Sequence, residues 1–204
     1  MAIRALFPTL LYRGALIKAG GVRFNNTLLD ECQALAASDE AGRRWSAKSY
    51  LGGYTSYGSL DRLHLVSSLF AGLARRLDPH VKAFAHRLQV DLRGRTLAIT
   101  DCWVNVMPAG VVHSLHLHPT SFISGTYYVQ VPKGAGALKF EDPRLSRMMA
   151  APPRQTFVSV PARAGELILF ESWLRHEVPP ARYAGERISI SFNYGWSARR
   201  GGAR

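Results

Sequence analysis

The chain has few cysteines and no long apolar run. Its 204 residues include only Cys32 and Cys102, which form no CxxC pair, so we expect neither a disulfide framework nor a thiolate zinc site. No apolar stretch approaches the roughly 20 residues that a membrane helix needs. The N-terminus has Arg4 and an apolar patch, as signal peptides do, but Pro8 and Arg13 interrupt the patch and no small-residue cleavage site follows. These absences favour a cytoplasmic protein without membrane contact, whose two thiols are reduced and partly buried.

Acidic residues are also scarce. The 14 Asp and Glu residues are outnumbered by 26 Lys and Arg residues, which gives a formal net charge of +12. Such a charge favours anionic partners in general, such as nucleic acid, acidic peptides or phosphates. Outside the tail at residues 197–204 the basic residues are scattered, so the charge alone identifies no partner.

The chain shows no internal repeat, and its pattern changes once, near residue 95. Before this point, helical apolar spacing follows residues 25–27, and a second apolar stripe fills residues 60–77. We expect residues 78–79 to break that helix and a new one to begin there. The weakly alternating start of the chain predicts a strand and a turn, and the polar, glycine-dotted residues 38–60 predict a long loop.

Residues from about 95 to 196 are instead short β-branched or aromatic runs separated by Gly and Pro. The runs are TLAITDCWVNVM, FISGTYYVQVP, GALKFED, TFVSVPA, GELILFES, RHEVPP and RISISFNYGW. Several short strands at close intervals predict a sandwich or a barrel. We therefore expect one mainly β domain over residues 1–204, with helical support over about 1–94, a β-rich core over about 95–196 and a basic tail.

Three histidines, His113, His116 and His118, fall within six positions. In extended backbone, residues i and i+2 point to the same face, so His116 and His118 can aim at one point while Leu117 points away. Imidazole is a common ligand of transition metals near neutral pH. Two ligands on one strand need a third from elsewhere. His176, just after the run GELILF, is the natural candidate, with His113 as a spare.

An arginine in the last predicted strand is the second unusual feature. In RISISFNYGW, Arg187 shares a face with Ser189 and Ser191, while Ile188 and Ile190 face the other way. An inward-facing arginine is costly unless an anion satisfies it, and a bound carboxylate does so through a bidentate pair. The alternative is a structural ion pair with an acidic residue. The candidates for that pair are Glu141, Asp142 and Glu166.

The order of these motifs resembles that of a known family. HxH, SGTYYV, G-x-L-x-F, G-x-L-x-L-F, H-x-V and R-x-S-x-S-F-N look like the iron(II)- and 2-oxoglutarate-dependent oxygenases, in particular a small bacterial and phage branch related to prolyl hydroxylases. The resemblance covers about residues 97–196. It implies a double-stranded β-helix, or jelly roll, with a metal at one open end and the N-terminal helices as support.

The resemblance also implies roles for single residues. His116 matches the first ligand of the family's HxD pair, His176 matches the distal histidine, and Arg187 matches the arginine that binds the far carboxylate of 2-oxoglutarate. The remaining assignments are Ser189, Tyr128 and Asn105 for the cosubstrate, and Trp103, Met107 and Trp173 for a substrate pocket.

The chain departs from the family at one ligand. His118 stands where the family has aspartate, so the expected set of two histidines and one carboxylate becomes three histidines. Three neutral imidazoles leave the iron more positive, which favours a dianionic cosubstrate. Glu171 and Glu177 are the alternative carboxylates, although an extended segment would point Glu177 away from its neighbour His176.

The activity that the resemblance implies is hydroxylation of a C–H bond with Fe(II) and 2-oxoglutarate. By analogy with prolyl hydroxylases, we expect a peptide, an amino acid or another small substrate. Nucleic acid is less favoured, because the last strand lacks the Arg-Asn-Thr-Arg signature of the alkylation-repair branch. Two alternatives stay open: a metal-dependent anion-binding or sensing module without turnover, and a three-histidine dioxygenase that does not use 2-oxoglutarate. The oligomeric state is also open, with a homodimer as one option.

Overall fold

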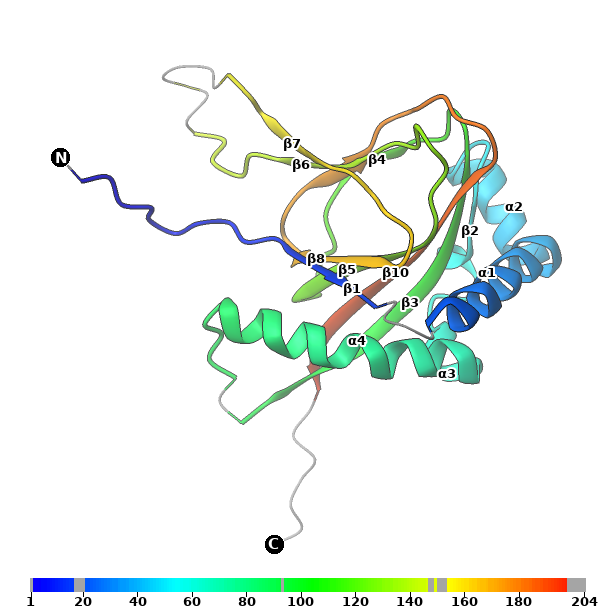
Figure 1. The fold of residues 1–204 in the computed structure, drawn as a ribbon, viewed down its shortest axis with the longest axis horizontal. Coiled ribbons are helices and arrows are strands. Elements are labelled where there is room, and N and C mark those ends of the chain that lie inside the picture. Colours follow the sequence, from blue (N-terminus) through cyan, green and yellow to red (C-terminus); the bar gives the residue numbers. More distant parts are fainter. Residues whose placement is uncertain (1, 17–20, 93, 147–148, 150–153, 198–204) are drawn as a thin grey trace, which may run out of the picture.

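Two antiparallel β-sheets face each other across the interior of the protein, and helices cover the outside of the larger sheet (Figure 1). The computed structural model describes residues 2–16, 21–92, 94–146, 149 and 154–197. The basic tail that we expected at residues 197–204 therefore lies outside the described residues, except for Ser197.

The larger sheet has six strands in the order β1-β8-β5-β10-β3-β2. Their bounds are β1 (Tyr12–Ala15), β8 (Glu166–Glu171), β5 (Ile123–Gln130), β10 (Glu186–Ser197), β3 (Thr96–Pro108) and β2 (Tyr54–Thr55). The smaller sheet has the order β4-β9-β6-β7, with β4 (His113–His116), β9 (His176–Val178), β6 (Leu138–Glu141) and β7 (Phe157–Val160). This two-sheet arrangement, with chain neighbours separated between the sheets, confirms the predicted jelly roll.

The central strand β10 separates two apolar layers. Ile188, Ile190 and Phe192 are fully buried in the layer that packs against the helices. Arg187 and Ser189 alternate with them and line a cavity on the other face. The predicted period-2 pattern of this strand is therefore present, and it turns the polar side chains toward the space between the sheets.

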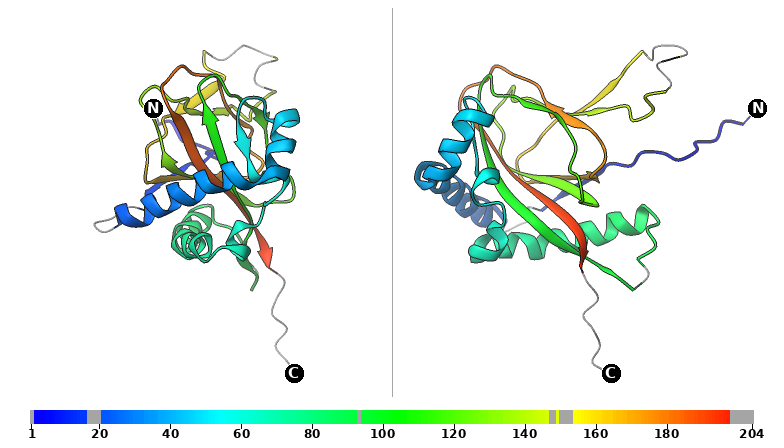
Figure 2. Two further views of the ribbon diagram at one scale, coloured as in Figure 1. Left: turned by 90° about the vertical axis from the view of Figure 1, so that its right-hand side faces the viewer. Right: turned by 180° about the vertical axis from the view of Figure 1, so that it is seen from behind.

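The helices come from the N-terminal part of the chain. They are α1 (Gly21–Ser38), α2 (Glu40–Ser49), the 3₁₀ turn η1 (Ser56–Gly58), α3 (Leu63–Val66) and α4 (Ser68–Arg87). The views in Figures 1 and 2 place α1 and α4 on the outer side of the larger sheet, where both helices contact β3. Among the described residues, no helix is both long and apolar enough to cross a membrane.

Two predictions for this part of the chain were wrong. Residues 38–60 are not a loop, since they form α2, β2 and η1. The chain does not break at Pro79 either, because α4 runs through it. The buried stripe of Leu73, Leu77, Val81 and Phe84 continues on both sides of Pro79, so packing outweighs the roughly 3 kcal/mol that an internal proline costs a helix.

The N-terminal part is also less purely helical than we expected. β1 pairs with β8, and β2 pairs with β3, so both ends of the larger sheet come from residues before 95. The predicted turn at the end of the first segment is not present at Gly21, which is instead the first residue of α1. The support region and the β core therefore share one sheet.

Asp39 explains why residues 38–60 are ordered. Its side chain caps α2 by accepting a hydrogen bond from the N–H of Gly42, and it also accepts hydrogen bonds from the hydroxyls of Tyr54 and Ser59. One carboxylate thus joins the start of α2 to β2 and to the residue after η1. This connection matters for function because α2, η1 and the residues between them contribute to the wall of the cavity.

Replacing Asp39 with alanine is expected to lower the free energy of unfolding by about 1–2 kcal/mol, the usual cost of losing an N-cap. Burial alone would raise the pKa of Asp39, but the hydrogen bonds from Ser59, Gly42 and Tyr54 outweigh it and lower the pKa. The contribution is therefore present above the unfolded-state pKa of about 3.9 and is lost as the pH falls through the lower folded-state value. Urea unfolding of both proteins across this range checks it. A difference that stays constant in acid would show that the carboxylate charge plays no part.

Candidate metal centre

A cavity of about 430 Å³ lies between the two sheets. Side chains of β3, β5, β8 and β10 line it from the larger sheet, and side chains of β4, β6 and β9 line it from the smaller one. Residues of α2, β2 and η1 complete the wall. The cavity therefore lies where strands from both sheets and the N-terminal segments meet.

His116, His118 and His176 meet in this cavity. One ring nitrogen of each lies within 4.8 Å of the others, and the Nε2 atoms of His118 and His176 are 3.3 Å apart. His116 and His176 face each other across the β4–β9 pair, with ring centroids 4.3 Å apart. His116 and His176 are thus neighbours in the smaller sheet, and His118 lies just beyond β4. Together they bring three imidazoles to one point.

Backbone carbonyls fix the orientation of two of these rings. Nδ1 of His116 lies 2.6 Å from the carbonyl oxygen of Ser114, and Nδ1 of His176 lies 2.9 Å from that of Leu174. A carbonyl only accepts, so Nδ1 must carry the proton in both rings. The lone pair is then on Nε2, which is the usual arrangement for a histidine that binds a metal.

The side chain of Asn193 fixes the orientation of the third ring, that of His118. Nδ1 of His118 lies 2.8 Å from Oδ1 of Asn193. The amide is itself oriented, because its Nδ2 donates to Asp101 at 3.2 Å and its Oδ1 also accepts from Ser124 at 2.8 Å. His118 therefore also presents an Nε2 lone pair, and it depends on Asn193 to do so.

The three rings are neutral in the absence of a cation. Burial, with the neighbouring His116 as the next cause, lowers the pKa of His176 to about 2 and that of His118 to about 4. Burial also lowers the pKa of His116. Three neutral nitrogen donors with converging lone pairs and fixed tautomers fit a divalent transition metal such as iron.

His113 does not join this group. Its ring packs against Tyr50, with centroids 4.6 Å apart, and burial lowers its pKa to about 3. Among the described residues, the only set of His, Cys, Asp or Glu side chains close enough to hold an ion is His116, His118 and His176. The geometry therefore favours the interpretation of His113 as a packed neighbour.

Arg187 lies in the same cavity without a counter-ion. It is 2% exposed, its Nη1 contacts the sulfur of Met107 at 3.1 Å, and its Nε has no hydrogen-bond partner. The guanidinium carbon lies 5.0 Å from the ring centroid of Tyr128, whose hydroxyl is also buried without a partner, as is that of Tyr50. A buried cation surrounded by unsatisfied donors requires an anion, and a carboxylate would satisfy it.

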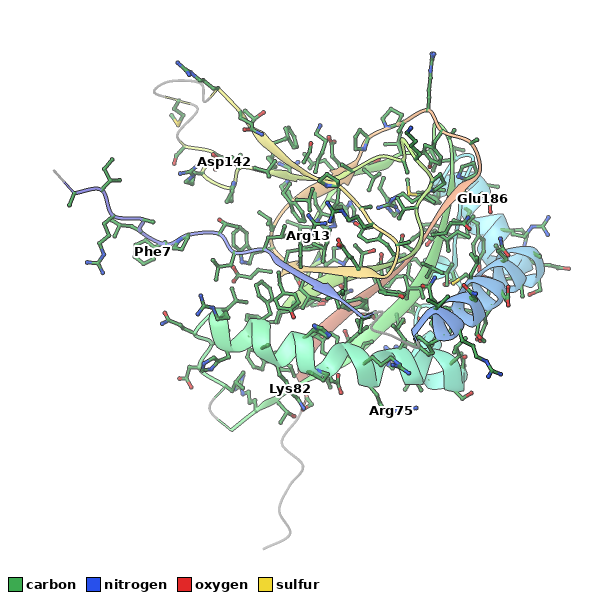
Figure 3. The ribbon with its side chains drawn as sticks, viewed as in Figure 1. Phe7, Arg13, Arg75, Lys82, Asp142 and Glu186 are labelled. Atoms are coloured by element: carbon green, nitrogen blue, oxygen red, sulfur yellow. The ribbon has the colours of Figure 1, made fainter. Side chains whose placement is uncertain are left out.

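The structural ion pair that we considered for Arg187 is wrong. The three candidate carboxylates bind other arginines: Glu141 binds Arg175, Asp142 binds Arg144 and Glu166 binds Arg13. Figure 3 shows Asp142 near the end of β6 and Arg13 on β1, and neither residue lines the cavity. Among the described residues, no acidic side chain forms an ion pair with Arg187.

Residues 101–193 match the model of a family described as "Putative 2OG-Fe(II) oxygenase". This span contains the three histidines and Arg187. This part of the chain is therefore similar to the iron(II)- and 2-oxoglutarate-dependent oxygenases. Among curated proteins, none matches the chain by sequence.

Solved structures of such oxygenases share the fold over most of the chain. A prolyl-4-hydroxylase from Pseudomonas putida has a TM-score of 0.64 at 20% identity, over 95% of this chain and 94% of that one. The epimerase SnoN, in complex with Fe3+, alpha ketoglutarate and nogalamycin RO, has a TM-score of 0.66 at 18% identity, over 96% and 88%. HygX from Streptomyces hygroscopicus, with nickel and 2-oxoglutarate bound, has a TM-score of 0.60 at 14% identity, over 92% of this chain and 83% of that one. At these identities the likeness shows the fold.

Most residues assigned to the cosubstrate lie around Arg187. Ser189 lines the cavity beside it, and Tyr128 is opposite Ser189 in the β5–β10 pair. Asn105 is opposite Ser189 on the other side. Its Nδ2 donates to Ser191 at 3.0 Å, while its Oδ1 is buried without a partner.

The substrate-pocket assignments are less uniform. Trp103 lines the cavity, with its ring 5.8 Å from that of His118, and Met107 lies beneath Arg187 rather than at the surface of the cavity. Trp173 does not line the cavity, and it is 47% exposed. The turn between β8 and β9 directs the next residue, Leu174, inward and leaves Trp173 outside.

The carboxylate alternatives to His118 receive no support. Oε1 of Glu177 accepts a hydrogen bond from Nζ of Lys139 at 2.7 Å, on the neighbouring strand β6. Neither Glu171 nor Glu177 is part of the cavity lining. As alternation predicts, Glu177 points away from its neighbour His176.

Sequence reasoning missed Asn193 and Asp101, and it considered Tyr50 only as part of a tyrosine-rich segment around residues 50–57 that could suit a substrate. Asn193 ends the motif R-x-S-x-S-F-N and lies an even number of positions after Arg187, so the strand period could have placed it in the cavity. Asp101 and Tyr50 had no comparable signal. Tyr50 in particular reaches the site from the end of α2, far from the β core in the chain.

Replacing Asn193 with alanine is expected to weaken Fe(II) binding by about 10- to 100-fold, the usual effect of losing a partner that orients a ligand. The reason is that His118 would lose the acceptor that fixes its tautomer. Anaerobic competition with a chelator measures the affinity. The matched control is the exposed Asn26→Ala on α1, which should bind iron as the wild type does. An Asn193→Ala protein with wild-type affinity would show that His118 needs no such partner.

Proposed function

We propose that this protein is an oxygenase that holds Fe(II) through His116, His118 and His176, binds 2-oxoglutarate through Arg187, and hydroxylates a C–H bond of a small molecule or a peptide. The observation that carries the proposal is the pairing of two features in one cavity. Three fixed imidazole lone pairs converge there, and a buried arginine has no counter-ion there. Each feature is costly unless a ligand satisfies it.

The bound iron and cosubstrate would supply the oxidation, in which dioxygen converts 2-oxoglutarate to succinate and carbon dioxide and oxidises the substrate. The chain's own residues bind and orient. Arg187 would form a bidentate pair with the far carboxylate, and the hydroxyls of Ser189 and Tyr128 would donate to the same group. The apolar side chains of Phe170 and Val178 line the cavity beside His176 and exclude water from it.

Three histidines are also the donor set of dioxygenases that do not use 2-oxoglutarate, and a module that only binds an anion would need the same arginine. The unpaired guanidinium of Arg187 favours use of 2-oxoglutarate over the first of these alternatives. The cavity beside the histidines gives a substrate room to approach, which favours turnover over the second.

Anaerobic titration with Fe(II) and then 2-oxoglutarate, followed by exposure to oxygen and detection of succinate, tests this function. We expect the visible charge-transfer absorption of a 2-oxoglutarate–iron complex, and succinate above the level of protein without metal. Protein that binds iron but gives neither the absorption nor succinate, with a broad substrate panel, would rule the function out.

We also propose a cytoplasmic location and a small-molecule or peptide substrate rather than nucleic acid. Cys32 and Cys102 are both free and buried, and burial raises the pKa of both thiols. Thiols of this kind are unreactive, which agrees with a reducing compartment. Mass spectrometry of the intact protein under thiol-blocking conditions would detect both as free.

A further inference from the structure

The cavity has two ends of opposite character. Arg187 lies at one end, with Tyr50 and His113. At the other end Asp61 and Asp101 line the wall beyond His118. Among the lining residues, Arg187 is the only lysine or arginine. In a chain with net charge +12, a cavity wall lined by carboxylates is contrary to the overall charge.

A row of aromatic rings runs along the acidic end. Trp103 stacks beside His118 at 5.8 Å, Tyr57 meets Trp103 edge to face at 5.1 Å, and Trp45 meets Tyr57 at 6.2 Å. Trp103 is 6% exposed, whereas Trp45 and Tyr57 are 36% and 52% exposed. The row therefore leads from the surface to the histidines, and its outer members present aromatic surface that no side chain covers.

The carboxylates of Asp61 and Asp101 keep acceptor atoms that make no hydrogen bond within the described residues. Oδ2 of Asp101 accepts from Thr100 and Asn193, but its Oδ1 has no hydrogen-bond partner among the described residues. The carboxylate of Asp61 has no partner there either. Neither aspartate forms an ion pair within the described part of the chain. Acceptor atoms thus remain free at the wall of the cavity.

We propose that this acidic and aromatic end binds a cationic group of the substrate, an ammonium or a guanidinium on an aliphatic stem. The inference rests on the proposed function, because it names the substrate class of the same site. Aromatic faces attract cations, and carboxylates form charge-assisted hydrogen bonds with them. A cation held between Trp103, Tyr57 and Asp61 would bring its stem past His118 toward the three histidines. An anionic group would be repelled there, and Arg187 at the other end is reserved for the cosubstrate.

The wall is built partly from elements outside the family match. Trp45 lies on α2 and Tyr57 in η1, whereas the matched residues begin at 101. The N-terminal segment therefore supplies Trp45, Tyr57 and Asp61 to the acidic and aromatic end, next to Trp103 and Asp101 of β3. The β core supplies the chemistry.

The test uses arginine and citrulline, which have nearly the same shape but differ in charge. The protein is first loaded anaerobically with Fe(II) and 2-oxoglutarate, and the charge-transfer absorption reports on that step alone. Binding of each compound is then measured by calorimetry, once as the free amino acid and once in the middle of a blocked tripeptide. We expect arginine to bind at least about tenfold more tightly than citrulline in one of the two forms, and the form that binds identifies the source as a free amine or a basic peptide.

A variant that removes one charge tests whether Asp61 causes the preference for arginine over citrulline. Asp61→Asn should weaken arginine binding about tenfold and leave both citrulline binding and the charge-transfer absorption unchanged. The control Glu40→Gln removes the same charge from an exposed position on α2 outside this cavity and should change nothing. Equal binding of arginine and citrulline, or binding of neither by protein that shows the absorption, overturns the cation site and leaves the oxygenase function intact. Loss of the absorption itself would instead contradict the proposed function.

Discussion

Replacing His118 with alanine is expected to lower the affinity for Fe(II) by at least about 100-fold, more than the loss of an orienting partner costs. His118 is one of three fixed Nε2 donors, and its Nε2 lies 3.3 Å from that of His176. Without it, two imidazoles remain, and no carboxylate among the described residues is placed to replace the third. Anaerobic competition with a chelator measures the affinity, and circular dichroism checks that the fold is kept.

His113→Ala is the matched control. His113 lies next to the same ring cluster, 5.7 Å from His116, but outside the converging group. Its loss should change iron affinity by no more than a few-fold. Wild-type affinity in His118→Ala would make His118 a spectator and would favour a site completed by two histidines and other ligands. Equal losses in both variants would point to a collapse of the cavity rather than to ligation.

The sequence was most informative where one period governs a whole strand. The alternation in β10 separates Ile188, Ile190 and Phe192 from Arg187 and Ser189, because a shift by one residue would bury the polar set among the helices. The spacing of His116 and His118 worked for the same reason. Local patterns of this kind predicted the mainly β core and the residues that converge.

Features that depend on distant partners were not predictable. The polar helix α2 buries only Gly42 and Ser46, so it lacks the apolar stripe that would have distinguished it from a loop. Its order depends on Asp39, which is bonded to Tyr54 and Ser59. The contribution of Tyr50 to the cavity follows from that arrangement. Such contacts are set by tertiary structure, and no local pattern encodes them.

Trp173 shows the limit of reading pockets from residue type. A tryptophan three positions before His176, a proposed metal ligand, is a reasonable pocket residue by composition. Its direction depends on a tight turn, in which the N–H of Leu174 donates to the carbonyl of Glu171. Because of that turn, Leu174 faces inward and Trp173 faces outward. The wall residues that do face the cavity, Tyr57 and Trp45, come from the segment that we expected to be a loop.

Arg187→Met is expected to stabilise the protein without ligands and to abolish its stabilisation by 2-oxoglutarate. In the wild type a buried guanidinium has no counter-ion and has an unsatisfied Nε. Replacing a buried ion pair with apolar side chains of similar volume is often stabilising by about 1–4 kcal/mol, and a lone buried charge lacks even the partner that offsets its desolvation. Met fills much of the same volume against Met107 and Tyr128, so no large cavity should offset the gain.

The same substitution removes the partner for the far carboxylate of the cosubstrate. Wild-type protein with Fe(II) and 2-oxoglutarate at about 100 times its dissociation constant should gain about 2.7 kcal/mol of unfolding free energy. Arg187→Met should gain nothing from 2-oxoglutarate while it still gains from Fe(II), because the three histidines are unchanged. Anaerobic urea unfolding with and without each ligand separates these contributions.

Arg13→Met is the control for this pair of effects. Arg13 also lies on the larger sheet, but it forms a partly exposed ion pair with Glu166. Its replacement should lower stability by no more than about 1 kcal/mol and leave the response to 2-oxoglutarate intact. A ligand-free Arg187→Met protein less stable than the wild type would mean that Arg187 is a structural residue. A retained response of Arg187→Met to 2-oxoglutarate would mean that the cosubstrate binds elsewhere. For a residue that serves binding, Arg187→Met should raise the stability of the ligand-free protein and remove the stabilisation by 2-oxoglutarate. The reason is that the free energy lost by burying the guanidinium is recovered only when the anion binds.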